Sequence, residues 1–404
     1  MKRESVITIF TALIFILVFA VNHFFINPKD FNEKLLKVGF LYDGDESIPY
    51  ANNFFRSQYM AQELFAGRVE FIVKSNVTPD KTDDVLEELV QEGCTLIFTT
   101  SYSHVIIAKE FAEKYPDVQF CQSCGDNANE APVLENYHTF MGEIHQGRYV
   151  SGIVAGMKIK QLIEDGVITE DEAKIGYVGA YPYNSVISGY TAFLLGARSI
   201  VPSIKMTVVY TYTWSSFSDE KACAKHLIDE GCVVISQHSD TSGPAIACEE
   251  SFEKPVYHIA YNQSMVDIAP MTSLSGCRIN WTPYITGAIK AVLENKVIEK
   301  SIKGHVHGND IGAGFDLDWV QMLEVNHKPA APGTEEKVRA AVQAFKKGKV
   351  SVFQGDYIGV NTNDENEIYD LRKEYKECAN ASAPSFCYIL KDVITIDELS
   401  LFDD

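Results

Sequence analysis

The chain has 404 residues, enough for two domains, and its 46% hydrophobic and 22% charged residues are typical of a globular protein. Its formal net charge is -20. That charge argues against a nucleic-acid partner, which needs a basic face, and against docking on anionic lipid.

The first residues predict a targeting or anchoring segment. Lys2 and Arg3 precede an almost unbroken apolar run, Val6 to Val21, whose length is near the lower limit for a membrane span of roughly 17 to 25 residues. No Cys directly follows the run, and no clean small-residue cleavage site follows it either. Residues 1–27 are therefore expected to be a signal anchor or a signal peptide. The anchor is favoured, with the bulk of the chain outside the cytoplasm.

Short apolar strands alternate with helices from residue 37 onward. Strands are predicted at 37–42, 69–73, 95–99 and 118–121, and helices at 51–65, 83–92 and 104–115. Gly93 and Pro116 end the second and third of these helices. This alternation is the βαβ signature of a parallel, doubly wound α/β sheet.

The same alternation starts again after residue 137. Strands are predicted at 138–141, 174–178, 205–210, 232–236 and 255–259, and helices at 146–163, 185–200, 219–229 and 286–294. Since no low-complexity linker separates the two series, they predict two lobes that face each other across a cleft. A helix at 335–347 and late strands at 351–353 and 386–390 complete the expected elements.

The strand at 232–236 leads into a cluster of polar residues that includes His238 and Asp240, and Pro244 then opens a helix. In an open α/β sheet, ligands bind beyond the carboxyl ends of the strands. The two side chains are placed at such an end, where they could exchange hydrogen bonds with a polar, uncharged ring system. The alternative is that they only cap the helix and fill the turn.

Aromatic and small polar side chains follow several of the other predicted strands. Aromatic faces combined with a few polar groups suit a flat heteroaromatic ligand held between rings. Each aromatic taken alone could instead belong to the core, but their shared place at strand ends favours ligand contact. The candidate ligand-binding residues of this kind are Tyr50, Phe54, Tyr181, Trp214, Phe217, Asn262, Ser264 and Trp281.

No motif for a cofactor or metal stands out. The chain has no P-loop, no G-x-S-x-G elbow and no H-E-x-x-H, and residues 176–180 lack the full dinucleotide-binding spacing. The odd count of nine cysteines does not predict a closed disulfide framework, and Cys121 and Cys124 lack a second pair at zinc spacing. No cofactor or metal is expected. Whether Cys378 and Cys387 form a bridge stays open.

Several blocks of the chain resemble the basic membrane protein family of ABC-transporter substrate-binding proteins, of the purine nucleoside receptor type. The resemblance spans roughly residues 37 to 325 and is carried by 136–156, 174–198, 213–217 and 231–240. It implies a type I periplasmic-binding-protein fold with three hinge crossings and a purine nucleoside or nucleobase between the lobes. Lobe 1 is then expected to comprise residues 37–141 with 262–305, and lobe 2 residues 142–261 with 306–404.

The resemblance also implies roles for individual residues. Tyr50 falls where the family has a stacking aromatic, Trp214 matches the Trp of the second lobe, and His238 with Asp240 matches its polar pair. Asn262 and Ser264 fall in the third-strand loop of the family, and Trp281 matches another block.

Two features depart from the family pattern. The family's nucleoside receptors carry an Asp-x-Ser-Phe-Asn motif where this chain has residues 48–52, Ile-Pro-Tyr-Ala-Asn, which counts against ribose recognition of that kind. The lipoprotein Cys is also missing, so the apolar helix itself would be the tether.

Three functions are weighed against one another. The first is an extracytoplasmic binding protein that delivers a small purine-like ligand to an ABC permease in the cell membrane. The second is a membrane-tethered sensor that uses the same cleft. The third is an enzyme in which His238 and Asp240 form an acid–base pair. No nucleophile or metal set accompanies that pair, so catalysis is not expected.

Overall fold

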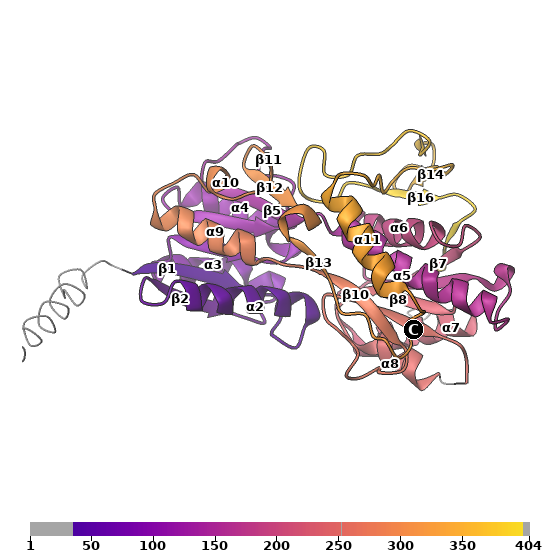
Figure 1. Cartoon of the computed structure of the whole chain (residues 1–404). Helices are drawn as coiled ribbons and strands as arrows, with labels where there is room; N and C mark the ends of the chain where they lie inside the picture. The colour runs from indigo at the N-terminus through magenta and orange to yellow at the C-terminus, as the bar shows by residue number, and fades with distance from the viewer. Residues whose placement is uncertain (1–34, 252, 399–404) are drawn as a thin grey trace, which may run out of the picture. The chain divides into compact units, whose positions relative to one another are not determined.

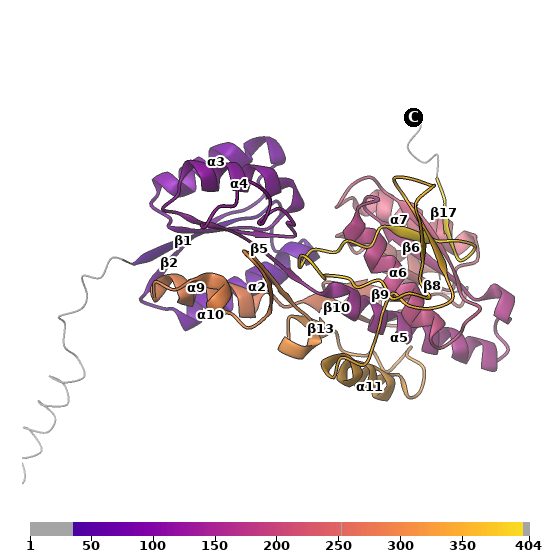
Figure 2. The same cartoon turned by 90° about the horizontal axis from the view of Figure 1, so that it is seen from above.

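The structure, a computed structural model, describes residues 35–251 and 253–398. From Lys37 onward these residues belong to one compact unit. Its described strands form two seven-stranded sheets and one three-stranded sheet, with helices packed on the large sheets (Figure 1 and Figure 2). Each large sheet is the centre of one lobe, which confirms the predicted two-lobed α/β fold.

The sheet of lobe 1 is mainly parallel and has helices on both faces. In spatial order its strands are β11 (His305–His307), β12 (Asp310–Ala313), β5 (Tyr137–Gly142), β4 (Gln119–Ser123), β3 (Leu96–Thr99), β1 (Leu36–Leu41) and β2 (Val69–Lys74). Its helices are α2 (Pro49–Leu64), α3 (Thr82–Gln91), α4 (Val105–Lys114), α9 (Thr282–Leu293) and α10 (Ile298–Ser301). Figure 2 shows α3 and α4 on one face and α2, α9 and α10 on the other. Because both faces are covered, β3 and β5 are buried at every residue.

The sheet of lobe 2 follows the same plan. In spatial order its strands are β13 (Val320–Met322), β10 (Ser273–Ile279), β9 (Tyr257–Tyr261), β8 (Val234–His238), β6 (Lys174–Gly179), β7 (Lys205–Tyr210) and β17 (Ile394–Ile396). Its helices are α5 (Ile144–Glu164), α6 (Asn184–Arg198), α7 (Phe217–Asp229) and α8 (Gly243–Glu250). All of the pairs are parallel except that of β13 with β10. The carboxyl ends of β6, β7, β8 and β9 therefore lie along one edge.

Helices α5 and α6 touch backbone to backbone at two glycines. A Cβ atom placed on Gly152 would lie 1.8 Å from the carbonyl oxygen of Phe193, and one on Gly196 would lie 1.9 Å from that of Tyr149. Real Cβ atoms essentially never approach so closely, so only glycine fits at either position. The two glycines thus set the distance between these helices in lobe 2.

In the described part of the chain, the backbone passes between the lobes three times, after β5, after β10 and after β12. The crossing segments are hydrogen-bonded to one another: the Glu143 N–H donates to the Ala313 carbonyl at 2.9 Å, and the Asn280 N–H donates to the Trp319 carbonyl at 2.8 Å. At the first crossing, His305 Nδ1 lies 2.5 Å from Glu143 Oε1. These contacts join all three crossings into one hinge region.

The second and third crossings lie further along the chain than the expected lobe boundaries. Strand β10 pairs with β9 in lobe 2, with Ser273 opposite His258, although residues 262–305 were expected in lobe 1. Strand β12 pairs with β5 in lobe 1, with Asp310 opposite Thr139. The reason is that β10 has the sequence Ser-Leu-Ser-Gly-Cys-Arg-Ile, which is buried but has no continuous apolar run to reveal a strand.

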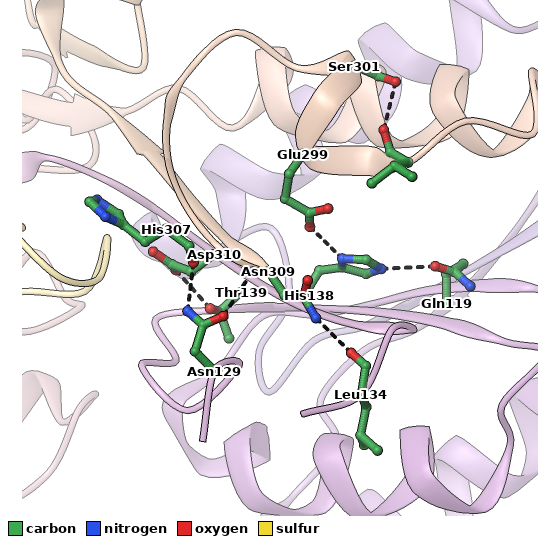
Figure 3. Close-up of polar contacts among 11 residues, drawn as sticks. Gln119, Asn129, Leu134, His138, Thr139, Glu299, Ser301, His307, Asn309 and Asp310 are labelled. Carbon is green, nitrogen blue, oxygen red and sulfur yellow. Dashed lines mark hydrogen bonds and ion pairs between the residues drawn. The ribbon is translucent and has the colours of Figure 1, made fainter. Parts of the chain in front are cut away.

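A buried polar network fixes the segment that returns to lobe 1 (Figure 3). His138 Nδ1 lies 2.5 Å from Glu299 Oε1 in α10, and His138 Nε2 lies 2.9 Å from Gln119 Oε1 in β4. Beside it the Thr139 hydroxyl donates to Asp310 Oδ1 at 2.8 Å. Because a buried polar group without a partner costs about 1–3 kcal/mol, these pairings favour one arrangement of β5, β12 and α10.

The chain beyond β13 adds a helix and a small sheet. Helix α11 (Thr334–Lys346) packs on α5. Strands β14 (Ile358–Asn361), β15 (Ile368–Asp370) and β16 (Tyr388–Leu390) then form the antiparallel order β15-β14-β16, and β17 joins the edge of the lobe 2 sheet. The predicted strand at 351–353 is reduced to a single bridge from Phe353 to Tyr375. Residues 357–398 are called the C-terminal segment below.

All nine cysteines are free, so neither Cys121–Cys124 nor Cys378–Cys387 is bridged. Among the described residues, no group of three or more His, Cys, Asp or Glu side chains is placed to hold a metal ion. No helix within 35–251 and 253–398 is long and apolar enough to cross a membrane. The expected anchor at residues 1–27 lies outside the described residues.

Candidate functional site

A cavity of about 270 Å³ lies at the carboxyl ends of the strands of both lobes. The C-terminal segment lines it as well. From lobe 1 it is lined by Asp43, Tyr50, Ser101, Tyr102, Cys124, Asp126 and Met141. From lobe 2 it is lined by Pro182, Tyr183, Asn184, Ser185, Trp214, His238, Asp240, Tyr261 and Asn262, and from the C-terminal segment by Asn363, Ala383 and Pro384.

Half of the ten residues predicted from the sequence line this cavity. They come from both lobes and from four different strand ends, so the fold gathers residues that are far apart in the sequence. These five are Tyr50, Trp214, His238, Asp240 and Asn262.

Two predicted aromatics pack behind the cavity wall. Trp281 is fully buried, and its ring stacks on Phe54 with a centroid distance of 4.3 Å and an interplanar angle of 13°. The Tyr50 ring meets both of them edge-on, at 5.4 Å from Phe54 and 6.3 Å from Trp281. Phe54 and Trp281 therefore support Tyr50 and do not line the cavity.

The remaining three predicted residues also lie off the cavity lining. Tyr181 is not part of the lining, but its ring stacks on that of the lining residue Tyr183 with a centroid distance of 5.1 Å. Phe217 begins α7 and is 45% exposed. Ser264 is exposed, and its hydroxyl accepts a hydrogen bond from the Val266 N–H at 3.4 Å within a turn.

The loop after β8 is held in place by one buried carboxylate. Glu220, in α7, accepts hydrogen bonds from the Ser239 hydroxyl at 2.7 Å and the Thr241 N–H at 3.1 Å. The Asp240 N–H donates to the Trp214 carbonyl oxygen at 2.9 Å. The loops after β7 and β8 are thus coupled, and this places Trp214 and Asp240 at the cavity together.

Burial shifts the pKa values of the polar pair at the end of β8 in opposite directions, each toward the neutral form of the group. Burial, with a further effect from the Arg148 guanidinium, lowers the pKa of His238 well below its ordinary value of 6.5. Burial, together with the negative charges of Glu220 and Asp43, raises the pKa of Asp240 well above 3.8. A neutral imidazole beside a carboxyl group with a raised pKa can both donate and accept hydrogen bonds.

The Tyr50 hydroxyl is already engaged by the protein. It donates to the Thr100 carbonyl at 2.8 Å and lies 3.1 Å from Cys124 Sγ. Because its proton is engaged by the Thr100 carbonyl, Tyr50 can offer a ligand its ring but not a hydrogen-bond donor. The backbone at Cys124 has a φ of 61°, in the left-handed region, which turns the loop after β4 toward the cavity.

Charge on the cavity lining is of one sign. Asp43 and Asp126 line it together with Asp240, whose ionisation is disfavoured by burial, and among the residues that the structure describes no lysine or arginine does. The arrangement can accept hydrogen bonds from N–H or O–H donors and disfavours an anionic ligand. Six lining side chains carry aromatic rings: Tyr50, Tyr102, Tyr183, Trp214, His238 and Tyr261.

Arg148, which the sequence analysis did not single out, stands directly behind this wall. Its guanidinium lies 3.4 Å from the ring centroid of Tyr261, and the residue is fully buried in α5. Within the described part of the chain, none of its three guanidinium nitrogens has a hydrogen-bond partner. A buried cation stacked on a tyrosine face gains cation–π energy, so Arg148 and Tyr261 hold each other in place. A lone charged residue in the otherwise uncharged 147–156 stretch was the available signal.

The other lining residues differ in whether a sequence pattern could have predicted them. Asp43, Tyr102 and Asp126 follow β1, β3 and β4, so the strand-end argument applied to every strand would have found them. Asn363 and Pro384 have no such signal, because they lie beyond the residues that resemble the family.

Two α/β lobes joined by three crossings, with a cavity at their strand ends, define a two-lobed solute-binding protein. The family of PnrA-like ABC transporter substrate-binding proteins, called Bmp, matches residues 57–338, and the chain belongs to this family. Such proteins act outside the cytoplasm and present a small-molecule ligand to a permease, which gives this chain an extracytoplasmic, ligand-binding role.

Sequence relatives with named ligands include two proteins. A purine-binding protein of Brucella abortus is 29% identical over 266 residues, which cover 65% of this chain and 70% of that protein. A Haloferax volcanii protein, provisionally named an ABC transporter glucose-binding protein, is 27% identical over 262 residues. That alignment covers 65% of this chain and 61% of the relative, less than two thirds of its length.

Solved structures share the fold. An ABC transporter solute-binding protein of Aeropyrum pernix has a TM-score of 0.60 at 15% identity, covering 78% of this chain and 87% of that one. A second, from Conexibacter woesei, has a TM-score of 0.58 at 16% identity, covering 78% and 97%. At these identities the likeness concerns the fold alone.

Proposed function

We propose that the protein binds a purine nucleobase or nucleoside in the cavity between its lobes and delivers it to an ABC permease. The observation that carries this proposal is the combination at the cavity of ring faces from both lobes, such as Tyr50 and Trp214, with the polar pair His238 and Asp240. A purine has two flat faces for stacking and an edge that carries hydrogen-bond donors and acceptors.

Size and charge restrict the ligand further. A cavity of about 270 Å³ is slightly smaller than most drug-sized sites, which are roughly 300–1,000 Å³. The carboxylates of Asp43 and Asp126 would repel a phosphate. We therefore favour an uncharged or protonated base over a nucleotide. The purine named for the Brucella relative supports the same class.

Titration calorimetry of the full chain tests the proposal, with adenine, guanosine, inosine, ribose, glucose and leucine as ligands. We expect binding of at least one purine and none of leucine. Binding of glucose or ribose without any purine would replace the proposal with a sugar receptor, the class that the name of the Haloferax relative suggests.

We also propose that the protein is attached to the membrane through the apolar run Val6–Val21, which the sequence predicts as an uncleaved anchor. Attachment would keep the receptor close to its permease without a lipid.

A further inference from the structure

The C-terminal segment lies outside the part of the chain that defines the family, yet it reaches the ligand cavity. The family match ends at residue 338, whereas Asn363, Ala383 and Pro384 line the cavity. We propose that residues 357–398 form a third wall of the ligand site, and that Asn363 and the Ala383–Pro384 turn set which ligands fit. This inference rests on the proposed function in one respect, namely that the cavity holds the ligand.

The segment is fixed to lobe 1 next to its cavity residues. The Ser382 N–H donates to Asp310 Oδ2 at 2.6 Å, and the Ser382 hydroxyl donates to Asp310 Oδ1 at 2.7 Å. Thr139 holds the same carboxyl group from β5, as Figure 3 shows. Ser382 and Asp310 are each 1% exposed, so the tie is shielded from water. Ala383 and Pro384 follow directly and have little freedom to leave the cavity.

The two ends of the segment are fixed to lobe 2. Near its start, Arg198 Nε in α6 donates to the Tyr357 hydroxyl at 2.9 Å. Near its end, β17 pairs in parallel with β7, with Ile394 opposite Met206. Since the middle is tied to lobe 1, the segment spans both lobes beside the cavity. A wall held in this way keeps a definite shape in the ligand site.

The turn and the loop that reach the cavity differ in what they can offer a ligand. The turn is braced from within, because Glu377 accepts hydrogen bonds from the Ser385 N–H at 2.5 Å and the Phe386 N–H at 3.1 Å. Ala383 and Pro384 thus present a rigid apolar surface. Asn363 lies in the β14–β15 connection, and none of the described residues forms a hydrogen bond with its side chain. Its amide can donate to and accept from a ligand.

A matched pair of bulky variants tests the wall. Ala383→Phe places a ring into the cavity, whereas Ala379→Phe places the same ring on an exposed position of the same loop. Calorimetry of the full chain with adenine, guanosine and glucose should show affinity reduced about tenfold or more for Ala383→Phe, on the scale of overpacking a filled site. Ala379→Phe should bind like the wild type. Equal affinities in both variants would overturn the proposal.

A second pair of variants tests the proposal if Ala383→Phe does not fold. Asn363→Ala removes an exposed side chain and should fold normally, with Asn366→Ala as the control in the same loop. We expect Asn363→Ala to change the affinity for one ligand more than for the others, by about three- to tenfold, the scale of one hydrogen bond. An unchanged order of ligands and unchanged affinities would exclude Asn363 as a specificity determinant.

A measurement that needs no ligand distinguishes a failure of this inference from a failure of the proposed function. Cys124 is native, half-buried and part of the cavity lining, so its alkylation by iodoacetamide reports access to the cavity. Peptide mass spectrometry should show slower Cys124 alkylation in Ala383→Phe than in Ala379→Phe. If no purine binds the wild type but this difference holds, the purine assignment fails and the wall stands. Equal alkylation rates in the two folded variants would refute the wall.

Discussion

His238 and Asp240 lie two residues apart at the end of β8, and burial shifts their pKa values in opposite directions. The lowered pKa favours the neutral imidazole of His238, and the raised pKa disfavours ionisation of the Asp240 carboxyl group in the unliganded cavity. A ligand that donates a hydrogen bond to Asp240 would favour the ionised form, since a hydrogen bond to a carboxylate lowers its pKa. This is a way for the site to favour ligands with N–H donors.

Replacing Trp214 should weaken all purines alike. Its ring lines the cavity from lobe 2 and offers a stacking face that does not depend on the substituents of a base. We expect Trp214→Ala to cost about 1–3 kcal/mol of binding free energy for every purine that the wild type binds, the scale of base–aromatic stacking. Phe217→Ala is the control, because Phe217 is close in sequence but exposed. Calorimetry with a purine panel would contradict the assignment if the two variants lost equal affinity.

Replacing Asp240 should instead change the order of preference. Asp240→Asn exchanges an acceptor oxygen for an N–H₂ donor at nearly constant shape, so ligands that donate to this position lose a partner while ligands that accept there gain one. The expected difference between the two classes is about 1–3 kcal/mol. Asp267→Asn, at an exposed position off the cavity lining, is the control. A uniform loss across the panel, or a loss of thermal stability alone, would count against a ligand contact.

His305 gives the hinge region a dependence on pH. Hydrogen bonding to Glu143 raises the pKa of His305 from 6.5 to about 9. The pairing should therefore stabilise the fold fully below pH 6.5 and lose its effect as the pH rises through about 9. Melting temperatures of wild type and His305→Gln, measured from acid to alkaline pH, should differ at pH 6 and converge above pH 9. A gap that stayed constant over this range would show that protonation of His305 is not responsible.

At the scale of elements, the close contact of α5 and α6 predicts that a larger residue at Gly152 destabilises the protein. Gly152→Ala would place a methyl group against the Phe193 carbonyl, so the helices must separate or α6 must shift. We expect a loss of unfolding free energy of about 1–3 kcal/mol or more, as for overpacking in a core. Urea unfolding of this variant should be compared with Lys160→Ala, an exposed position on the same helix. Equal stabilities would show that the helices can adjust freely.

The elements that the sequence predicts well are those with a regular apolar pattern. Strands β1 to β9 and the helices between them follow from that pattern, because helices cover both faces of each sheet and leave continuous apolar runs. Strand β10 escapes it, since Ser273, Ser275 and Gly276 interrupt the run although the strand is buried. Strands β14, β15 and β17 are three or four residues long, too short for a period to show, whereas β16 lies within the strand predicted at 386–390.

The residues of the site likewise divide into those that a sequence pattern predicts and those that it does not. Strand-end reasoning places Tyr50, Trp214 and Asp240 at the cavity because the parallel strands of each sheet end together. It cannot separate a ring that faces the cavity from one that packs behind it, which is why Trp281 was among the candidates. That choice depends on the tertiary packing of Phe54 against Trp281, which no local pattern encodes.

At the scale of the whole molecule, the proposed anchor determines where the receptor is found. If Val6–Val21 stays attached, the mature protein should remain in the membrane fraction after a high-salt wash, because apolar burial in the bilayer is not weakened by salt. N-terminal sequencing should then begin at or close to Met1. A mature start between Val21 and Asn27, with the protein free in solution, would identify a cleaved signal peptide.

The way the chain threads between the lobes also determines the order in which a nascent chain can complete them. Thr139 in β5 and Asp310 in β12, which lie side by side in the finished sheet, are 171 residues apart in the chain. During synthesis β5 therefore forms the edge of an incomplete sheet until most of lobe 2 has been made. Open strand edges readily pair with other chains. Lobe 1, the first to begin folding, is thus finished only after β12 emerges, and β5 must be kept from the wrong partners until then.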